Sequence, residues 1–177
     1  PVLGWSQVKS GVTYSEHPGY DVVTESYRIW ESGTDADLRA LYTEDAKIWG
    51  PGDDEAGTVE DEVKGMLWWQ ENFDISFINM DPATPDIIKY KGEKGVWTID
   101  WMTFTGVNKE SGDTVTGPLH TMNYVNEDGK IEMTVNYFDR ESMGAQIQAS
   151  FGMHRNGRVY DEHPLIDKIN QMVTHFE

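Results

Sequence analysis

The residues that could do chemistry lie on predicted strands, and Asp139 is the first of them. Successive side chains of a strand point to opposite faces, so Asp139 shares a face with every second residue before it. Those residues are all apolar or aromatic: Ile131, Met133, Val135 and Tyr137. Because such a face must be buried, we expect Asp139 to be carried inward near the end of its strand. A carboxylate at the edge of an apolar cavity has a raised pKa, and it can take a proton from a carbon acid and return it.

His120 is the second candidate. His120 lies on the same face of its strand as Met122 and Tyr124, so we expect its side chain to point inward as well. There it could polarise a carbonyl group or relay a proton with Asp139. A histidine paired with a carboxylate in a pocket suits the enolisation of a carbonyl compound.

Structural roles are open for both candidates. Asp139 could instead cap the turn at residues 140–142 or pair with Arg140. His120 could be a core histidine whose ring is hydrogen-bonded to the backbone or to a tyrosine. Asp100 is a weaker candidate, because we expect its side chain to face solvent.

Aromatic residues make up 12% of the chain, which is the unusual feature of its composition. Large rings can form a packed core, or they can wall a cavity that binds an apolar molecule containing a ring. The residues predicted to contact such a ligand are Tyr27, Tyr42, Trp49, Trp69, Trp97, Trp101, Met122 and Tyr137.

Length and charge exclude several kinds of protein. The chain has 177 residues, which fits one domain that can hold a core and still enclose a pocket. Its 31 acidic and 14 basic residues give a net charge of −17. Nucleic acids and anionic membrane surfaces both favour Lys and Arg, so we expect neither as a partner. No stretch approaches the roughly 20 apolar residues of a membrane-spanning helix.

The sequence gives no reason to expect a metal or another cofactor. Without cysteine there can be no disulfide, zinc–thiolate site, iron–sulfur cluster or thiol nucleophile. The other histidines lack the spacing of metal ligands, and the acidic runs at 53–55 and 60–62 lack the calcium-loop pattern. The chain starts at Pro1 rather than Met, so we slightly favour an exported or periplasmic protein over a cytoplasmic one.

The elements that must position these residues follow from the spacing of apolar side chains and from capping signals. Helices are predicted at 20–33, from Thr34 towards 43–45, and from Thr58 to Phe73. Strands follow at 75–80, 87–90, 96–107, 114–126 and 130–139, with a bend or bulge at Gly117-Pro118. Residues 140–151 are expected to form either a short helix or a last turn against the mouth of the sheet. The predicted fold class is α+β, with N-terminal helices packed on a strongly curved antiparallel sheet.

The two ends of the chain extend this domain, which we place at residues 20–151. Residues 1–19 are predicted to be an irregular N-terminal arm. Residues 152–177 form a C-terminal extension with an amphipathic helix, whose apolar stripe runs from Leu165 to Phe176. This stripe must cover its own domain or a partner chain, so a homodimer is expected.

The order of elements resembles the nuclear transport factor 2-like cone fold, and more narrowly its SnoaL-like branch of polyketide cyclase relatives. The segments that carry this resemblance are 41–46, 97–106, 118–120, 126–131 and 137–139, with Gln146 and Gln148. The most specific are the Asp-Gly-Lys-Ile turn at 128–131 and the aromatic-x-Asp at 137–139. The resemblance implies a cone-shaped cavity between sheet and helices, and Asp139 matches the acid/base aspartate of SnoaL-like cyclases.

Three functions follow as hypotheses. The first is acid/base chemistry of the isomerase, cyclase or lyase type, without a cofactor, on a small apolar carbonyl compound. The second is a protein that binds such a molecule without transforming it. The third is a homodimeric interaction module with a vestigial cavity. Relatives that share the fold include isomerases, epoxide hydrolases and proteins without catalysis, so the residues inside the cone must decide.

Overall fold

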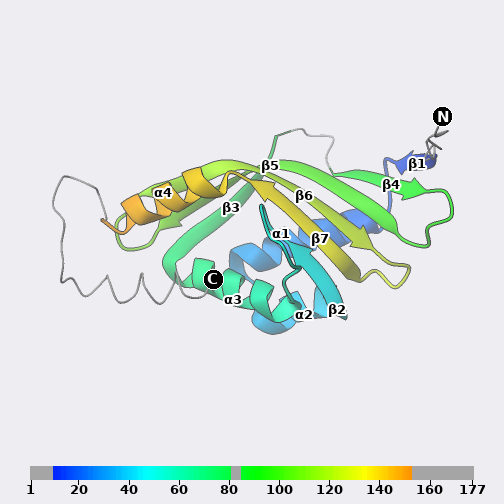
Figure 1. Cartoon of the computed structure of the whole chain (residues 1–177), viewed down its shortest axis with the longest axis horizontal. Helices are drawn as coiled ribbons and strands as arrows, with labels where there is room; N and C mark the ends of the chain where they lie inside the picture. Colours follow the sequence, from blue (N-terminus) through cyan, green and yellow to red (C-terminus); the bar gives the residue numbers. More distant parts are fainter. Residues whose placement is uncertain (1–9, 81–84, 153–177) are drawn as a thin grey trace, which may run out of the picture.

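The computed structural model describes residues 10–80 and 85–152, which form a curved sheet with the first three helices on its concave side (Figure 1). The helices are α1 (Gly19–Ser32), α2 (Asp35–Leu41), α3 (Val59–Asn72) and α4 (Arg140–Ser150). The strands are β1 (Gly11–Tyr14), β2 (Tyr42–Trp49), β3 (Phe73–Asn79), β4 (Asp86–Tyr90), β5 (Val96–Asn108), β6 (Thr114–Val125) and β7 (Ile131–Phe138). The predicted α+β class is confirmed.

Local capping signals define the helix ends, as predicted. Thr34 and Thr58 begin α2 and α3, and each forms a reciprocal capping box with an aspartate three residues later. α1 ends at Gly33, where an added Cβ would lie 2.7 Å from the Cα atom of Ile29. The backbone of Gly33 is extended, so glycine is needed there for close approach rather than for a left-handed turn.

The sheet has the order β1-β4-β5-β6-β7-β2, with β3 also paired to β5. The long β5 strand accepts β4 along its first half and β3 along its second half. All of these pairs are antiparallel except β2 with β7, so the expected antiparallel sheet is in fact mixed. A tight hairpin forces an antiparallel pair, whereas β2 and β7 are separated by most of the chain and are free to run in parallel.

The middle of β6 differs from the expectation. Its register with β5 runs without a bulge through Gly117 and Pro118. β7 pairs with β6 only from Leu119 onward, so the proline lies where β6 has no second strand beside it. Beyond that point α4 takes the place of a strand. The Gln146 amide donates to the Thr116 carbonyl at 3.0 Å and accepts from the Thr116 N–H at 2.9 Å.

Part of the expected N-terminal arm belongs to the sheet. Residues Gly11–Tyr14 pair with β4 as β1, and a Cβ on Gly11 would lie 2.6 Å from the carbonyl oxygen of Lys89. The predicted amphipathic helix at 165–176 lies outside the described residues. None of the helices within residues 10–80 and 85–152 is both long and apolar enough to cross a membrane.

Candidate active site

The side chain of His120 lies on the face of the sheet opposite to the one expected. His120 lies on the outer, convex face, where its ring stacks on Trp101 with the centroids 3.9 Å apart. Its Nδ1 atom is 2.7 Å from the backbone carbonyl oxygen of Asp100. Trp101 and Tyr137, the neighbours of His120 in the same row, are 52% and 54% exposed. The inward orientation predicted for His120 was wrong, because the more aromatic face of these strands is the outer one.

Asp139 lies at the N-terminus of α4, where it caps residues 140–142, the structural role given above as an alternative to catalysis. Its Oδ1 atom accepts the backbone N–H of Ser142 at 2.9 Å, which caps the helix. The carboxylate is thus held by α4 and the imidazole of His120 by the outer-face stack. The structure does not bring the two together as a proton-relay pair, and their catalytic roles stay predictions.

The inner, concave face instead carries a block of six polar side chains in the middle of the sheet. They form two rows across β5, β6 and β7, one of Thr98, Asn123 and Thr134 and one of Asp100, Thr121 and Asn136. Five of the six are at most 6% exposed, and Asn136 is half-buried. We call these six residues the polar block.

Apolar core lies on both sides of the polar block. On one side is the row Val96–Val125–Ile131, which packs against the inner faces of α2 and α3. On the other side Phe104 and Val115 pack with the aromatic side chains of α3 and β3. Burying polar groups in this position costs free energy unless they are hydrogen-bonded. A folded chain would be more stable with apolar residues there, which marks the block as a candidate site.

Asp100 is the acidic group of the block, and it is fully buried. Its Oδ2 atom accepts a hydrogen bond of 2.8 Å from the phenol of Tyr27, which α1 supplies from across the interior. Its Oδ1 atom is buried and has no hydrogen-bond partner within the described part of the chain. Burial raises the pKa of Asp100 to about 6, against the opposing effect of the Tyr27 hydrogen bond. Burial also raises the pKa of Tyr27, so that its phenol stays protonated.

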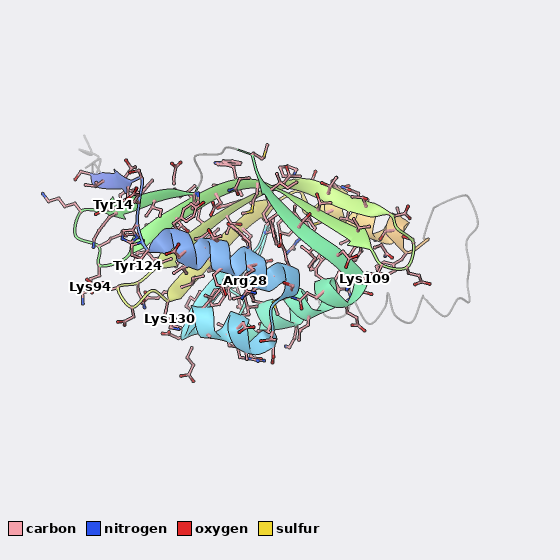
Figure 2. All side chains as sticks on the ribbon, turned by 180° about the vertical axis from the view of Figure 1, so that it is seen from behind. Tyr14, Arg28, Lys94, Lys109, Tyr124 and Lys130 are labelled. Atoms are coloured by element: carbon pink, nitrogen blue, oxygen red, sulfur yellow. The ribbon has the colours of Figure 1, made fainter. Side chains whose placement is uncertain are left out.

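Glu62 is a second acid with a raised pKa, half-buried on the helix side of the interior. Burial raises its pKa to about 7, and a hydrogen bond from the Trp30 side chain acts in the opposite direction. Burial, and to a lesser extent the charge of Glu62, raises the pKa of Tyr42, a residue whose hydroxyl touches the polar block. Figure 2 views the molecule from this side, with α1 lying across the concave face and Arg28 on its outward surface.

Several solved structures share the fold that carries the block. IdmH, a proposed polyketide cyclase from Streptomyces antibioticus, is 23% identical, and the alignment covers 74% of this chain and 99% of that one with a TM-score of 0.54. A protein of ketosteroid isomerase-like fold from Catenulispora acidiphila is 15% identical over 71% and 91% of the two chains, with a TM-score of 0.54. A proposed SnoaL-like polyketide cyclase from Shewanella denitrificans is 12% identical over 76% and 99%, with a TM-score of 0.54.

The chain has the nuclear transport factor 2-like cone fold. This confirms the resemblance drawn from the sequence at the level of the fold. No protein-family model and no curated protein sequence matches the chain, so the reaction must be argued from the residues inside the cone.

The cone separates the predicted ligand-binding residues into two groups. Tyr27, Tyr42 and Trp69 lie in the interior, where Trp69 packs on Phe73 and Phe104. Strand alternation and register place the other five on the outer face: Trp49, Trp97, Trp101, Met122 and Tyr137. An aromatic-walled cavity therefore stays a prediction. A shallow surface hollow between β1, β4 and α1 is lined by none of these eight residues.

A short repeated pattern could have revealed the polar block. Each of the three strands contains a threonine, one apolar residue and then Asp or Asn: Thr98-Ile99-Asp100, Thr121-Met122-Asn123 and Thr134-Val135-Asn136. Polar pairs spaced by two within otherwise apolar strands share one face. Within residues 10–80 and 85–152 no three His, Asp or Glu side chains are grouped closely enough to hold a metal ion.

Proposed function

We propose that this protein is an acid–base enzyme in which Asp100 moves a proton on a small carbonyl compound held between the sheet and the helices. One observation carries the proposal. Asp100 is fully buried, one of its carboxylate oxygens is fixed by Tyr27, and the other has no partner among the described residues. A desolvated carboxylate with a free oxygen is suited to proton transfer.

The reaction is an enolisation. The Oδ1 atom of Asp100 takes a proton from the carbon next to the carbonyl group of the ligand. The electron pair of that C–H bond forms the carbon–carbon double bond of the enolate, and the π pair of the carbonyl moves onto its oxygen. Where the enolate is conjugated with a further double bond, return of the proton from Asp100 to the far carbon of this dienolate completes an isomerisation. In a cyclisation the enolate carbon attacks a second carbonyl carbon, the π pair of that carbonyl moves onto its oxygen, and Asp100 returns its proton to this alkoxide oxygen. With a pKa of about 6, Asp100 is mostly ionised at neutral pH and can act as the base.

The test is hydrogen–deuterium exchange at the α-carbon of ring ketones in D2O, followed by NMR. We expect the protein to speed the exchange and Asp100→Asn to lower this rate about 100-fold or more. Asp113→Asn is the matched control, because Asp113 is exposed on the loop between β5 and β6. Exchange that survives in Asp100→Asn, or a wild-type protein that accelerates no ketone, would overturn the proposal.

The outer face supports a second proposal, that a copy of the same chain packs there as a homodimer. The face is apolar over three strands, with Ile99, Met122 and Val135 in the row beside the exposed Trp101 and Tyr137. Monomeric proteins rarely leave a large apolar patch open to water. A chain with a net charge of −17 can meet its own copy only through a surface with few charges.

Sedimentation velocity tests the dimer. We expect the wild-type protein to sediment as a dimer at micromolar concentration and Trp101→Glu to sediment as a monomer. Leu67→Glu is the control, since Leu67 is 45% exposed on α3, away from the outer face. A monomeric wild-type protein, or a Trp101→Glu variant that stays dimeric, would contradict the proposal.

A further inference from the structure

Two asparagines of the polar block are oriented by threonines on the neighbouring strand. The Thr121 hydroxyl on β6 donates to Oδ1 of Asn136 on β7 at 3.0 Å. The Thr134 hydroxyl on β7 donates to Oδ1 of Asn123 on β6 at 2.7 Å. The same Thr-to-Asn pair thus occurs twice, in adjacent rows and in opposite directions between the two strands.

These hydrogen bonds fix which way each amide points. A threonine hydroxyl has one proton, and here it is given to the amide oxygen, so the Nδ2 group of each asparagine turns away from its threonine. Because the Thr134 proton is used in this way, the Tyr42 hydroxyl at 3.2 Å must donate to the Thr134 oxygen. The two hydrogen bonds therefore run in the same direction, from Tyr42 to Thr134 and from Thr134 to Asn123.

Both Nδ2 groups are left as donors without an acceptor in the part of the chain that the structure describes. Asn123 is only 2% exposed, so water does little to compensate its amide. A largely buried donor without a partner lowers the stability of the folded protein. In the same block, Oγ1 of Thr98 and Oδ1 of Asp100 are fully buried and have no hydrogen-bond partner among the described residues. Several unsatisfied polar groups in one patch indicate a surface that a ligand completes.

We propose that Asn136 and Asn123 are two hydrogen-bond donors that select a ligand with two acceptor oxygens. The asparagines are diagonal neighbours on β6 and β7, a relation that places the two residues about 7–8 Å apart, with their Cβ atoms somewhat closer. That spacing matches oxygens on two sides of one small ring. This inference rests on the proposed function, because Asp100 in the row of Asn136 supplies the chemistry. The ligand is then an oxygenated carbonyl compound rather than the apolar one expected from the sequence.

Two ketones that differ by one oxygen test the inference: cyclohexanone and cyclohexane-1,4-dione. Their dissociation constants are measured by NMR titration with the wild-type protein and with Asn136→Leu and Asn123→Leu. We expect the dione to bind the wild-type protein about tenfold more tightly, the value of one well-made hydrogen bond. Each leucine variant should reduce that ratio to about one, while Gln148→Leu, an amide replacement on the exposed side of α4, should keep it.

The outcomes separate this inference from the acid–base proposal. Equal binding of the two ketones by the wild-type protein, or an unchanged ratio in Asn136→Leu, overturns the donor pair. Preference for the dione without α-carbon exchange overturns only the role of Asp100. Binding of neither ketone overturns both. Asn136 is half-buried, so Asn136→Leu decides the question even if Asn123→Leu does not fold.

Discussion

Asp100 shows how a single residue couples reactivity to stability. The desolvation that makes its carboxylate basic also penalises the charged form in the folded protein. Tyr27 offsets part of that penalty through its hydrogen bond, and the free Oδ1 leaves the rest. We therefore expect Asp100 to affect two measured quantities, the free energy of unfolding and the rate of α-carbon exchange, both as functions of pH.

The first expectation concerns stability against pH. In the unfolded chain Asp100 ionises near 3.8, whereas in the folded protein it keeps its proton to about 6. Between these values the folded state binds more protons, so the free energy of unfolding falls as pH rises. The loss is about 3 kcal/mol and is complete by about pH 7. Urea unfolding from pH 4 to 7 should show a smaller fall in Asp100→Asn, and parallel curves for the two proteins would contradict it.

The second expectation concerns rate. The phenol of Tyr27 favours the carboxylate form of Asp100, so Tyr27→Phe should raise the pKa of Asp100 further. The pH at which the α-carbon exchange rate reaches half its maximum should then move above about 6, the wild-type value. A pH–rate profile measures this shift, and a profile that keeps its midpoint in Tyr27→Phe would remove Tyr27 from the site.

At the scale of elements, local signals predicted the helices well and the sheet faces poorly. Thr34 and Thr58 act within four residues, so their capping boxes could be read directly. Alternation along the strands was also correct as a period. It could not tell which face meets the helices, because the outer face carries Trp101 and Tyr137 and looks more like a core. Contacts across the interior, such as that of Tyr27 with Asp100, decide the matter.

The same reasoning explains the candidate site. Asp139 was predicted to be an inward acid because its own strand face is apolar, but α4 begins directly after it and uses it as a cap. Asp100 was expected to face solvent, because the sequence does not show that α1 covers this part of the sheet. Burial raises the pKa of Asp100 and the hydrogen bond from Tyr27 lowers it, and both depend on residues distant in sequence whose contacts a single sequence does not show.

The capping box of α3 gives a prediction at this scale. Thr58→Ala removes the hydroxyl that accepts the Asp61 N–H, and with it the start of the helix that carries Glu62. The free energy of unfolding should fall by about 1 kcal/mol. Thr24→Ala is the control, because Thr24 is exposed within α1 and its hydroxyl only bonds back to Tyr20. Equal stability of the two variants in urea unfolding would show that the box contributes nothing.

For the whole molecule, charge is the dominant feature. The net charge of −17 is spread over one domain, and the ion pairs of the described residues, such as Arg39 with Glu60 and Arg140 with Asp53, are on its surface. Such pairs contribute little, while repulsion among the excess carboxylates opposes folding. Salt screens that repulsion.

Stability should therefore rise with ionic strength. Raising NaCl from about 10 mM to about 500 mM shortens the screening length from tens of ångströms to a few. We expect the Tm to increase by several degrees in differential scanning calorimetry at pH 7.5, where the carboxylates are ionised. Sucrose at matched osmolality adds no charge screening and serves as the control. A Tm that is constant or falls with NaCl would show that the repulsion is already balanced within the fold.

The parallel pairing of β2 with β7 has a consequence for how the chain folds. Tyr42 can meet Ile131 only after nearly all of the strands have been made, so on the ribosome β2 waits for the last strand of its sheet. Closing so long a loop is slow, because chain entropy is lost before the contact is gained. Until then the apolar side chains of β2, which include Ala46 and Ile48, lack their final cover. The interval before β7 emerges is thus when the newly made chain is most exposed to aggregation and most dependent on chaperones.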